Sequence, residues 1–173
     1  MSPLERDVEL ILRVIVGFLV GSLVGIERER AQLSRRSPAE TPGFRSFGLT
    51  GLYGAIVGVL LVQGSASYGA PVINLALILA TVFALVVGVN MLHRSFIARA
   101  GGIITHVVLA TTFALGLLAG LGMVIESIAI AMIVTLVLAI KTPVERAVKV
   151  ISYNELLAGF ELGLVVFTLG PIV

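Results

Sequence analysis

Apolar residues fill long stretches of this chain, and no Lys, Arg, Asp or Glu occurs between Arg45 and Arg94. A helix needs about 20 apolar residues to cross the hydrocarbon core of a bilayer. The uncharged stretch is long enough for two such helices, and the polar, glycine-containing residues 63–71 provide a turn between them. The pattern therefore predicts an integral membrane protein.

Six apolar segments predict an all-α, polytopic transmembrane helical bundle that forms a single domain. The expected spans are residues 8–26, 47–62, 72–92, 103–121, 123–140 and 155–173. The sixth differs from the others because it contains Glu161 and ends at Gly170 and Pro171. Between the last two spans, residues 142–152 are predicted to form a short interfacial helix, because Pro143 suits a helix start.

Composition supports a membrane bundle and argues against several other classes. The chain is 58% hydrophobic and 13% charged, and it has no Cys for a disulfide, a thiolate metal site or a Cys nucleophile. Its basic residues lie in short loops between apolar spans, which indicates membrane topology instead of nucleic-acid binding. We find no Walker A, HExxH or GxSxG sequence, so neither an enzyme nor a cofactor is expected.

The charges in the loops predict how the bundle is oriented in the cell membrane. The alternate loops that carry positive charge contain Arg28, Arg30, Arg35, Arg36 and Arg45, then Arg94 and Arg99, then Lys141, Arg146 and Lys149. The positive-inside rule places these loops in the cytoplasm and both termini outside. Arg6 and Arg13 oppose this orientation, but Glu5, Asp7 and Glu9 surround them.

Glycines recur at intervals of four residues in three of the spans. Gly17, Gly21 and Gly25 are in the first span, Gly54 and Gly58 in the second, and Gly116 and Gly120 in the fourth. Small residues at this spacing let membrane helices approach closely. The glycines indicate either a tight interface, around a pathway or with a second subunit, or ordinary packing inside the bundle.

The first two spans are joined by a charged motif, which begins Gly25-Ile26-Glu27-Arg28-Glu29-Arg30 and ends Gly43-Phe44-Arg45-Ser46. Glu27 and Arg28 lie where the first span ends, and Arg45 lies where the second begins. An acid and a base in these places can pair across the hairpin, and a partly buried pair is costly to break. The simpler interpretation is that the arginines anchor the helix ends at the membrane surface.

This motif resembles the membrane domain of the MgtC/SapB family, which commonly has Gly-Leu-Glu-Arg-Glu followed by Gly-Leu-Arg-Thr. The likeness covers residues 17–58. The rest is similar to the first half of a longer branch, in which this domain is fused to a second membrane domain of unknown function. The resemblance implies a role in magnesium homeostasis, through transport or through modulation of another membrane machine.

Three positions depart from the family pattern. Phe44 and Ser46 are mild changes, whereas His106 stands where that branch often has an acid. A carboxylate there would suit Mg²⁺, while a neutral imidazole prefers transition metals or carries a proton. The identity of any metal therefore stays open.

Polar residues within the apolar spans are the candidates for an ion or proton pathway, because such residues are rare in lipid and often functional. They are Asn90, Thr105, His106, Glu155 and Glu161. Glu155 and Glu161 do not share a helix face. Asn90, Thr105 and His106 are expected to face one cytoplasmic-side pocket.

Two functions fit these residues. The first is transport of a small cation, with Glu27 and Arg45 setting a gate and His106 and Glu161 contacting the ion or carrying a proton. The second is a regulatory subunit that binds another membrane protein and transports nothing. Either would act in the lipid bilayer, and we expect a homodimer or a separate second membrane half, because transporters are often built from two repeats.

Overall fold

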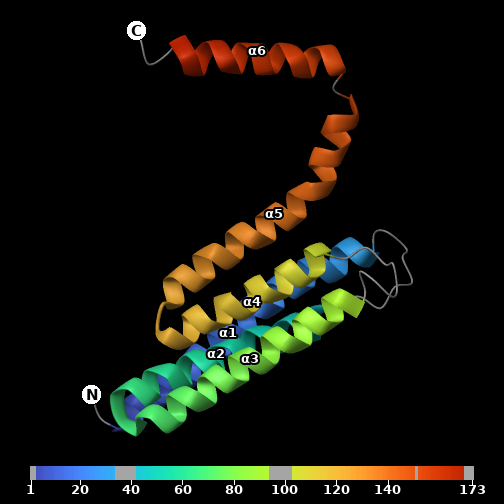
Figure 1. Cartoon of the computed structure of the whole chain (residues 1–173). Helices are drawn as coiled ribbons and strands as arrows, with labels where there is room; N and C mark the ends of the chain where they lie inside the picture. Colours follow the sequence, from blue (N-terminus) through green and yellow to red (C-terminus); the bar gives the residue numbers. More distant parts are fainter. Residues whose placement is uncertain (1–2, 34–41, 94–102, 151, 170–173) are drawn as a thin grey trace. The chain divides into compact units, whose positions relative to one another are not determined.

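The computed structural model describes residues 3–33, 42–93, 103–150 and 152–169, and all regular structure within these ranges is helical (Figure 1). The all-α prediction is confirmed. Two compact units make up the chain, and each is described by itself. Unit 1 is Met1–Leu138 and unit 2 is Ala139–Val173.

Within these described ranges, six α-helices and one π-helical turn follow each other. They are α1 (Pro3–Leu33), α2 (Phe44–Gln63), the π turn η1 (Gly64–Tyr68), α3 (Ala70–Leu92), α4 (Ile103–Leu121), α5 (Val124–Val150) and α6 (Tyr153–Leu169). The helices α1 to α4 lie side by side and run alternately up and down (Figure 1).

Five helices in the described part of the chain are long and apolar enough to cross a membrane. They are Leu4–Ala31, Phe44–Tyr68, Ala70–Leu92, Ile104–Leu121 and Val124–Lys141. The sixth predicted span does form a helix, but α6 has 17 residues and its apolar stretch is Leu157–Val166. At about 1.5 Å per residue, α6 is shorter than the roughly 30 Å hydrocarbon core.

The prediction of a separate helix over residues 142–152 is wrong, because α5 continues without a break from Val124 to Val150 and includes Pro143. Proline removes one backbone hydrogen bond and usually kinks or breaks a helix. Membrane helices nevertheless tolerate it when neighbouring groups compensate. Pro143 therefore lies in the interior of a helix and does not start one.

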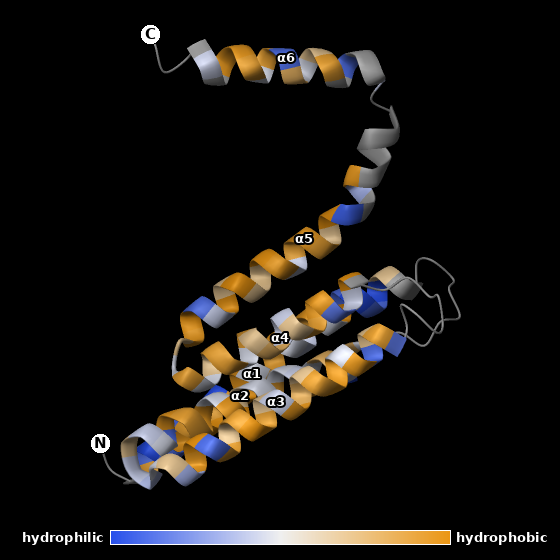
Figure 2. Ribbon diagram, in the orientation of Figure 1, coloured by the Kyte–Doolittle hydropathy of each residue, from blue (hydrophilic) through white to orange (hydrophobic). Residues whose placement is uncertain are grey.

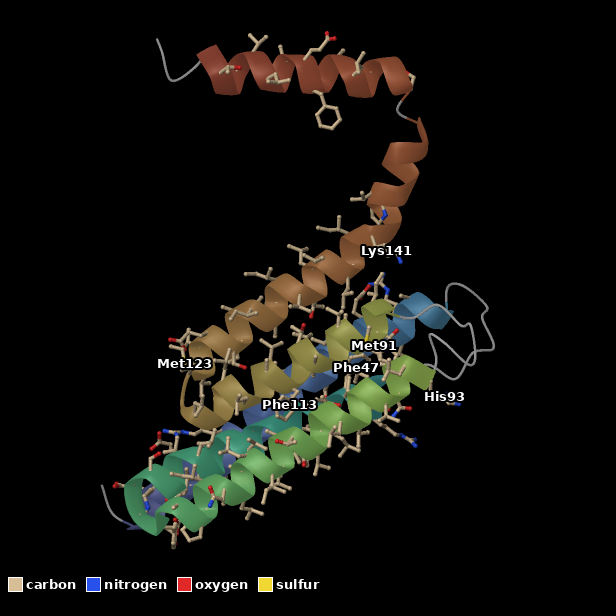
Figure 3. The ribbon with its side chains drawn as sticks, in the orientation of Figure 1. Phe47, Met91, His93, Phe113, Met123 and Lys141 are labelled. Carbon is tan, nitrogen blue, oxygen red and sulfur yellow. The ribbon has the colours of Figure 1, made fainter. Side chains whose placement is uncertain are left out.

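Helix α2 is the centre of unit 1, because α1, α3 and α4 all pack against it. Phe47 and Val57 of α2 are fully buried, and Figure 3 labels Phe47 within the helix group. Val20 and Val24 of α1 join Phe47, Val108, Leu115 and Ala131 in the apolar core. Ser127 connects α5 to this core, since its Oγ donates to the Leu115 carbonyl at 2.7 Å.

Three aromatic rings attach α3 to its neighbours. Phe83 of α3 stacks on Phe113 of α4 with centroids 4.4 Å apart, and Tyr53 of α2 lies 5.9 Å from Phe83. The Tyr53 hydroxyl donates to the Leu79 carbonyl at 3.0 Å. Aromatic pairs add about 0.5–1.5 kcal/mol beyond the area they bury, so this cluster helps to anchor α3, together with the fully buried Ala76.

Large apolar side chains cover the outward faces of unit 1. On α1 the exposed residues include Ile11, Ile15, Leu19, Leu23 and Ile26, and on α3 they include Leu75, Ile78, Val82, Leu85, Val86 and Val89. Most of the α3 ribbon is correspondingly coloured as hydrophobic in Figure 2. Water-soluble monomers rarely expose continuous apolar faces of this size. The chain is a multi-pass membrane protein.

Two glycines with positive φ make the tight turns at one end of unit 1. Gly69 has φ 73° and separates η1 from α3, while Gly122 has φ 98° and ends α4. At the second turn the Gly122 and Met123 amides donate to the Ala119 and Leu118 carbonyls, both at 3.0 Å. This is a Schellman motif, in which glycine at the left-handed position satisfies the last carbonyls of the helix.

Candidate functional site

The predicted packing glycines of α1 lie against α2. A Cβ on Gly17 would be 2.5 Å from the Ala55 Cβ and 2.9 Å from the Gly51 carbonyl oxygen, and a Cβ on Gly25 would be 2.8 Å from the Phe44 Cα. On Gly21 it would collide with the Phe47 carbonyl. The two helices therefore approach closely at three glycines over about two helical turns.

The glycines of α2 and α4 make a second contact of the same kind. A Cβ on Gly54 would meet the Phe113 carbonyl, one on Gly58 the Leu117 carbonyl, and one on Gly120 the Ala55 carbonyl. In this arrangement α2 is held by bare backbone contact on two sides. We call these two contacts between α1, α2 and α4 the glycine seams.

Gly51 joins the two glycine seams, although it is not one of the glycines that recur at intervals of four. A Cβ on Gly51 would collide with the Gly17 carbonyl, and a Cβ on Gly116 would collide with the Gly51 carbonyl. The signal was present in the sequence, because Gly48, Gly51 and Gly54 recur every three residues. Spacings of three and four together place glycine on two adjacent faces of α2.

At the arginine-rich end of unit 1, the hairpin motif and the start of α4 meet. The Arg28 guanidinium donates through Nη2 to the Thr105 hydroxyl at 2.7 Å, across 77 positions of sequence. Arg28 had been assigned to the hairpin and Thr105 to the ion pathway. The structure places them in one contact, which ties the end of α1 to the first turn of α4.

Glu29 makes the contact across the hairpin. Its Oε2 accepts a hydrogen bond of 3.0 Å from the Phe44 amide, the first amide of α2. A carboxylate there satisfies an otherwise unpaired amide and is favoured by the helix dipole. A Cβ on Gly43 would be 2.9 Å from the same oxygen, so a larger residue there would have to displace the end of the Glu29 side chain.

Glu27 and Arg45 do not make the expected pair across the hairpin. The Glu27 carboxylate lies 3.7 Å from the Arg30 guanidinium on its own helix, and Arg45 is exposed at the start of α2. Helix geometry explains the difference, because residues 27 and 29 lie about 200° apart around α1, and Glu29 is the one on the side of α2.

The candidate pathway residues are distributed over separate places. His106 is buried in α4, with 6% of its surface exposed. Asn90 is exposed on α3, where its Nδ2 donates to the Val86 carbonyl of the same helix at 2.9 Å. Figure 3 shows Met91 and His93 at the same end of α3. The described hydrogen bonds do not join Asn90 to Thr105 or His106 in a common pocket.

At the opposite end of unit 1, Arg13 binds the end of α4. Its Nη2 donates to Glu9 Oε1 at 2.5 Å, and its Nη1 lies 3.4 Å from the Gly120 carbonyl. The guanidinium also lies over Gly122, where a Cβ would be 3.1 Å away. A cation at a helix C-terminus is favoured by the helix dipole. Arg13 is therefore a structural cation, and the topology argument alone had not given it a role.

In unit 2, Glu155 has a local structural role. Its Oε2 accepts from the Ser152 amide at 2.8 Å, and its own amide lies 3.3 Å from Ser152 Oγ, which forms a capping box before the apolar stretch of α6. The bond from the Ser152 backbone is the main cause that lowers the pKa of Glu155, followed by the Ser152 side chain. Glu161 is exposed in the middle of α6.

The model of the MgtC family matches residues 14–147, which is more than half of the chain. The chain belongs to the MgtC family. No curated protein and no solved structure matched it.

The match includes both glycine seams, the hairpin motif and the Arg28–Thr105 contact of this MgtC-family chain. Glu9, Arg13 and the whole of α6 lie outside it. Among the residues that the structure describes, no group of three His, Asp or Glu side chains is placed to hold a metal ion. In the matched region, α1, α2 and α4 pack closely through their glycines. At the arginine-rich end, hydrogen bonds from Arg28 to Thr105 and from the Phe44 amide to Glu29 join these helices.

Proposed function

We propose that this MgtC-family protein acts in cation homeostasis as a non-conducting membrane module that binds another membrane protein. The single observation that carries this proposal is the pair of glycine seams. Backbone meets backbone between α1 and α2 and between α2 and α4. A Cβ on Gly17 would be 2.9 Å from the Gly51 carbonyl oxygen, and a Cβ on Gly25 would be 2.8 Å from the Phe44 Cα. Such contacts leave no space for a hydrated ion to pass between these three helices.

The polar groups beside the glycine seams support the same function, because they form hydrogen bonds with unpaired backbone groups at the helix ends or join two helices. Glu29 caps α2, and Arg13 binds the carbonyl end of α4. Arg28 fastens α1 to α4 through Thr105. Each of these groups stabilises a rigid unit, as a binding module requires.

Transport of a small cation is the second candidate, and the buried imidazole of His106 favours it. A histidine at membrane depth can bind a transition metal or carry a proton. In this case the conduit would run along α4 beside the glycine seams or between two copies of the chain. Glu161 would contribute only if α6 lined that conduit.

Flux measurements in liposomes separate the two candidates. The purified full chain is reconstituted with dyes for Mg²⁺, Ni²⁺ and protons inside the vesicles, beside Glu161→Gln and His106→Ala variants. We expect no flux above that of empty vesicles. A flux that both variants abolish would overturn the proposed function in favour of transport, whereas a flux that the variants leave unchanged would indicate leakage.

A further inference from the structure

Helix α1 carries an ion pair towards each of its ends, and the two pairs are exposed in opposite ways. At the arginine-rich end, the side chain of Arg30 is 79% exposed and that of its partner Glu27 is 16% exposed. At the other end, the side chain of Glu9 is 46% exposed and that of its partner Arg13 is 17% exposed. Within these pairs, the cation therefore faces outward at one end of α1 and the acid faces outward at the other.

The other described charges of unit 1 follow the same contrast. At the arginine-rich end, Arg45 is exposed at the start of α2, and one carboxylate oxygen of Glu29 accepts the bond from the Phe44 amide at 3.0 Å. At the opposite end, three acids and one base are exposed: Glu5, Asp7, Glu126 and Arg6. The surface at the arginine-rich end is therefore positive, and the surface at the opposite end is negative.

Exposed apolar side chains continue from Arg30 toward the middle of the membrane. Leu19, Leu23 and Ile26 precede Arg30 at steps of four, three and four, so all four residues share one side of α1. The apolar three are 57%, 40% and 54% exposed. From Leu19 to Arg30 the helix rises about 16 Å at 1.5 Å per residue, which is about half of the roughly 30 Å hydrocarbon core. This side of α1 therefore spans one leaflet and has a cation at the level of the headgroups.

Helix α2 repeats this arrangement over a shorter length. Arg45 and Leu49 are four residues apart and so lie on the same side of the helix, and Leu49 is 60% exposed. Because α1 and α2 pack directly against each other through Gly17 and Gly51, both arginines belong to one hairpin. A molecule bound to this hairpin meets guanidinium groups at the membrane surface and apolar side chains below them.

We infer that the arginine-rich end of the α1–α2 hairpin binds the headgroup of an anionic phospholipid, whose acyl chains lie along Leu19, Leu23 and Ile26. A guanidinium forms paired, charge-assisted hydrogen bonds with phosphate oxygens. Basic residues at a membrane surface attract lipids of net negative charge, whereas a zwitterionic lipid carries a cation beside its phosphate. The exposed acids at the opposite end repel the same headgroup, so the preference applies to one leaflet. This inference does not depend on whether the protein binds a regulatory partner or transports an ion.

Native mass spectrometry of the purified full chain tests the headgroup preference. The detergent-solubilised protein is mixed with equal amounts of phosphatidylglycerol and phosphatidylcholine that have the same acyl chains, and we expect phosphatidylglycerol to be retained preferentially. Arg30→Gln and Arg45→Gln should each lower its retention about fivefold, because each removes one cation from the surface. Arg6→Gln is the matched control on the same helix, and it should leave the retention unchanged because Arg6 lies among acids.

Two further measurements show whether charge and acyl chains are both required. Arg30→Lys and Arg45→Lys keep the charge and should retain most of the phosphatidylglycerol. Glycerol phosphate carries a negative charge without acyl chains, so it should not displace the lipid at equal concentration. Equal retention of the two lipids would overturn the inference, as would an equal loss in the Arg6 or Lys variants or displacement by glycerol phosphate.

Discussion

The Arg28 guanidinium and the Thr105 hydroxyl form a hydrogen bond of 2.7 Å that joins the end of α1 to the first turn of α4. Arg28 belongs to the charged hairpin motif, and His106, the next residue after Thr105, is buried in the same helix. The hairpin and the start of α4 therefore form one structural element at the arginine-rich end of unit 1.

The first prediction is that Arg28 and Thr105 act together in stability. In a double-mutant cycle with Arg28→Met and Thr105→Val, we expect the two losses of unfolding free energy to be non-additive. The coupling should be about 1.5–3 kcal/mol, the usual contribution of a hydrogen bond to a charged group. Thermal unfolding in detergent gives all four values, and simple additivity would show that the bond contributes nothing.

The second prediction concerns the carboxylate that caps α2. Glu29→Ala should lower the unfolding free energy by about 0.5–2 kcal/mol, because the Phe44 amide loses its acceptor. Glu27→Ala is the matched control, since it breaks a pair with the exposed Arg30 at 3.7 Å, which is worth about 0.2–0.5 kcal/mol. A larger loss for the Glu27 variant would contradict this assignment.

The third prediction tests the glycine seams. Gly116→Ala places a methyl group against the Gly51 carbonyl, so we expect a loss of about 1–3 kcal/mol from overpacking. Gly88→Ala adds the same group to α3 in open space and should cost nothing. Both variants are compared by thermal unfolding of the detergent-solubilised chain, and similar behaviour of the two would refute the seam geometry.

These seams also show how far the sequence alone could lead. Helices α2, α3 and α4 begin and end within a few residues of their predicted ranges, because apolar length and glycine-containing turns determine them. The intervals of four residues indicated glycine packing on α1 and α4. Gly51 was missed because its importance comes from touching two helices at once, and this depends on tertiary packing.

The polar contacts were harder to predict than the helices. Of the motif residues singled out from the sequence, Arg28 makes a long-range contact, with Thr105, whereas Glu27 and Arg45 do not pair across the hairpin. The choice of Glu29 as the cap depends on where α1 passes the start of α2. From the sequence, Arg13 was only a charge that opposes the predicted orientation, because its partner, the Gly120 carbonyl, is 107 positions away. Periodicity in the sequence predicts which side of a helix is buried, but it does not predict which distant residue a side chain contacts.

The fourth prediction addresses orientation in the membrane. Arg13 is bound to Glu9 and to the end of α4, so the loop arginines are left to set the topology. A thiol at Ser65→Cys, in the exposed η1 turn, should react with a membrane-impermeant maleimide added outside intact cells. A thiol at Arg30→Cys should react only after the cells are opened, and the reverse pattern would show the opposite orientation.

The fifth prediction concerns pH and the start of α6. The pKa of Glu155 is lowered by its bond from the Ser152 backbone, so the capping box is fully formed above the ordinary carboxyl pKa and is lost as the pH falls through the lowered value. Amide hydrogen exchange at the first turn of α6, in the full chain, should therefore accelerate in acid. Ser152→Ala and Glu155→Gln should weaken this dependence, and an unchanged profile would contradict it.

The position of Gly51 between two helices has a consequence for biosynthesis. Synthesis proceeds from the N-terminus, so α1 and α2 are complete before α4 is made, and one flank of α2 is then still uncovered. Until α4 is made, the α1–α2 hairpin thus leaves the glycine backbone on one side of α2 without a packing partner. A chain truncated after α3 would therefore leave the flank of α2 that α4 normally covers exposed to lipid.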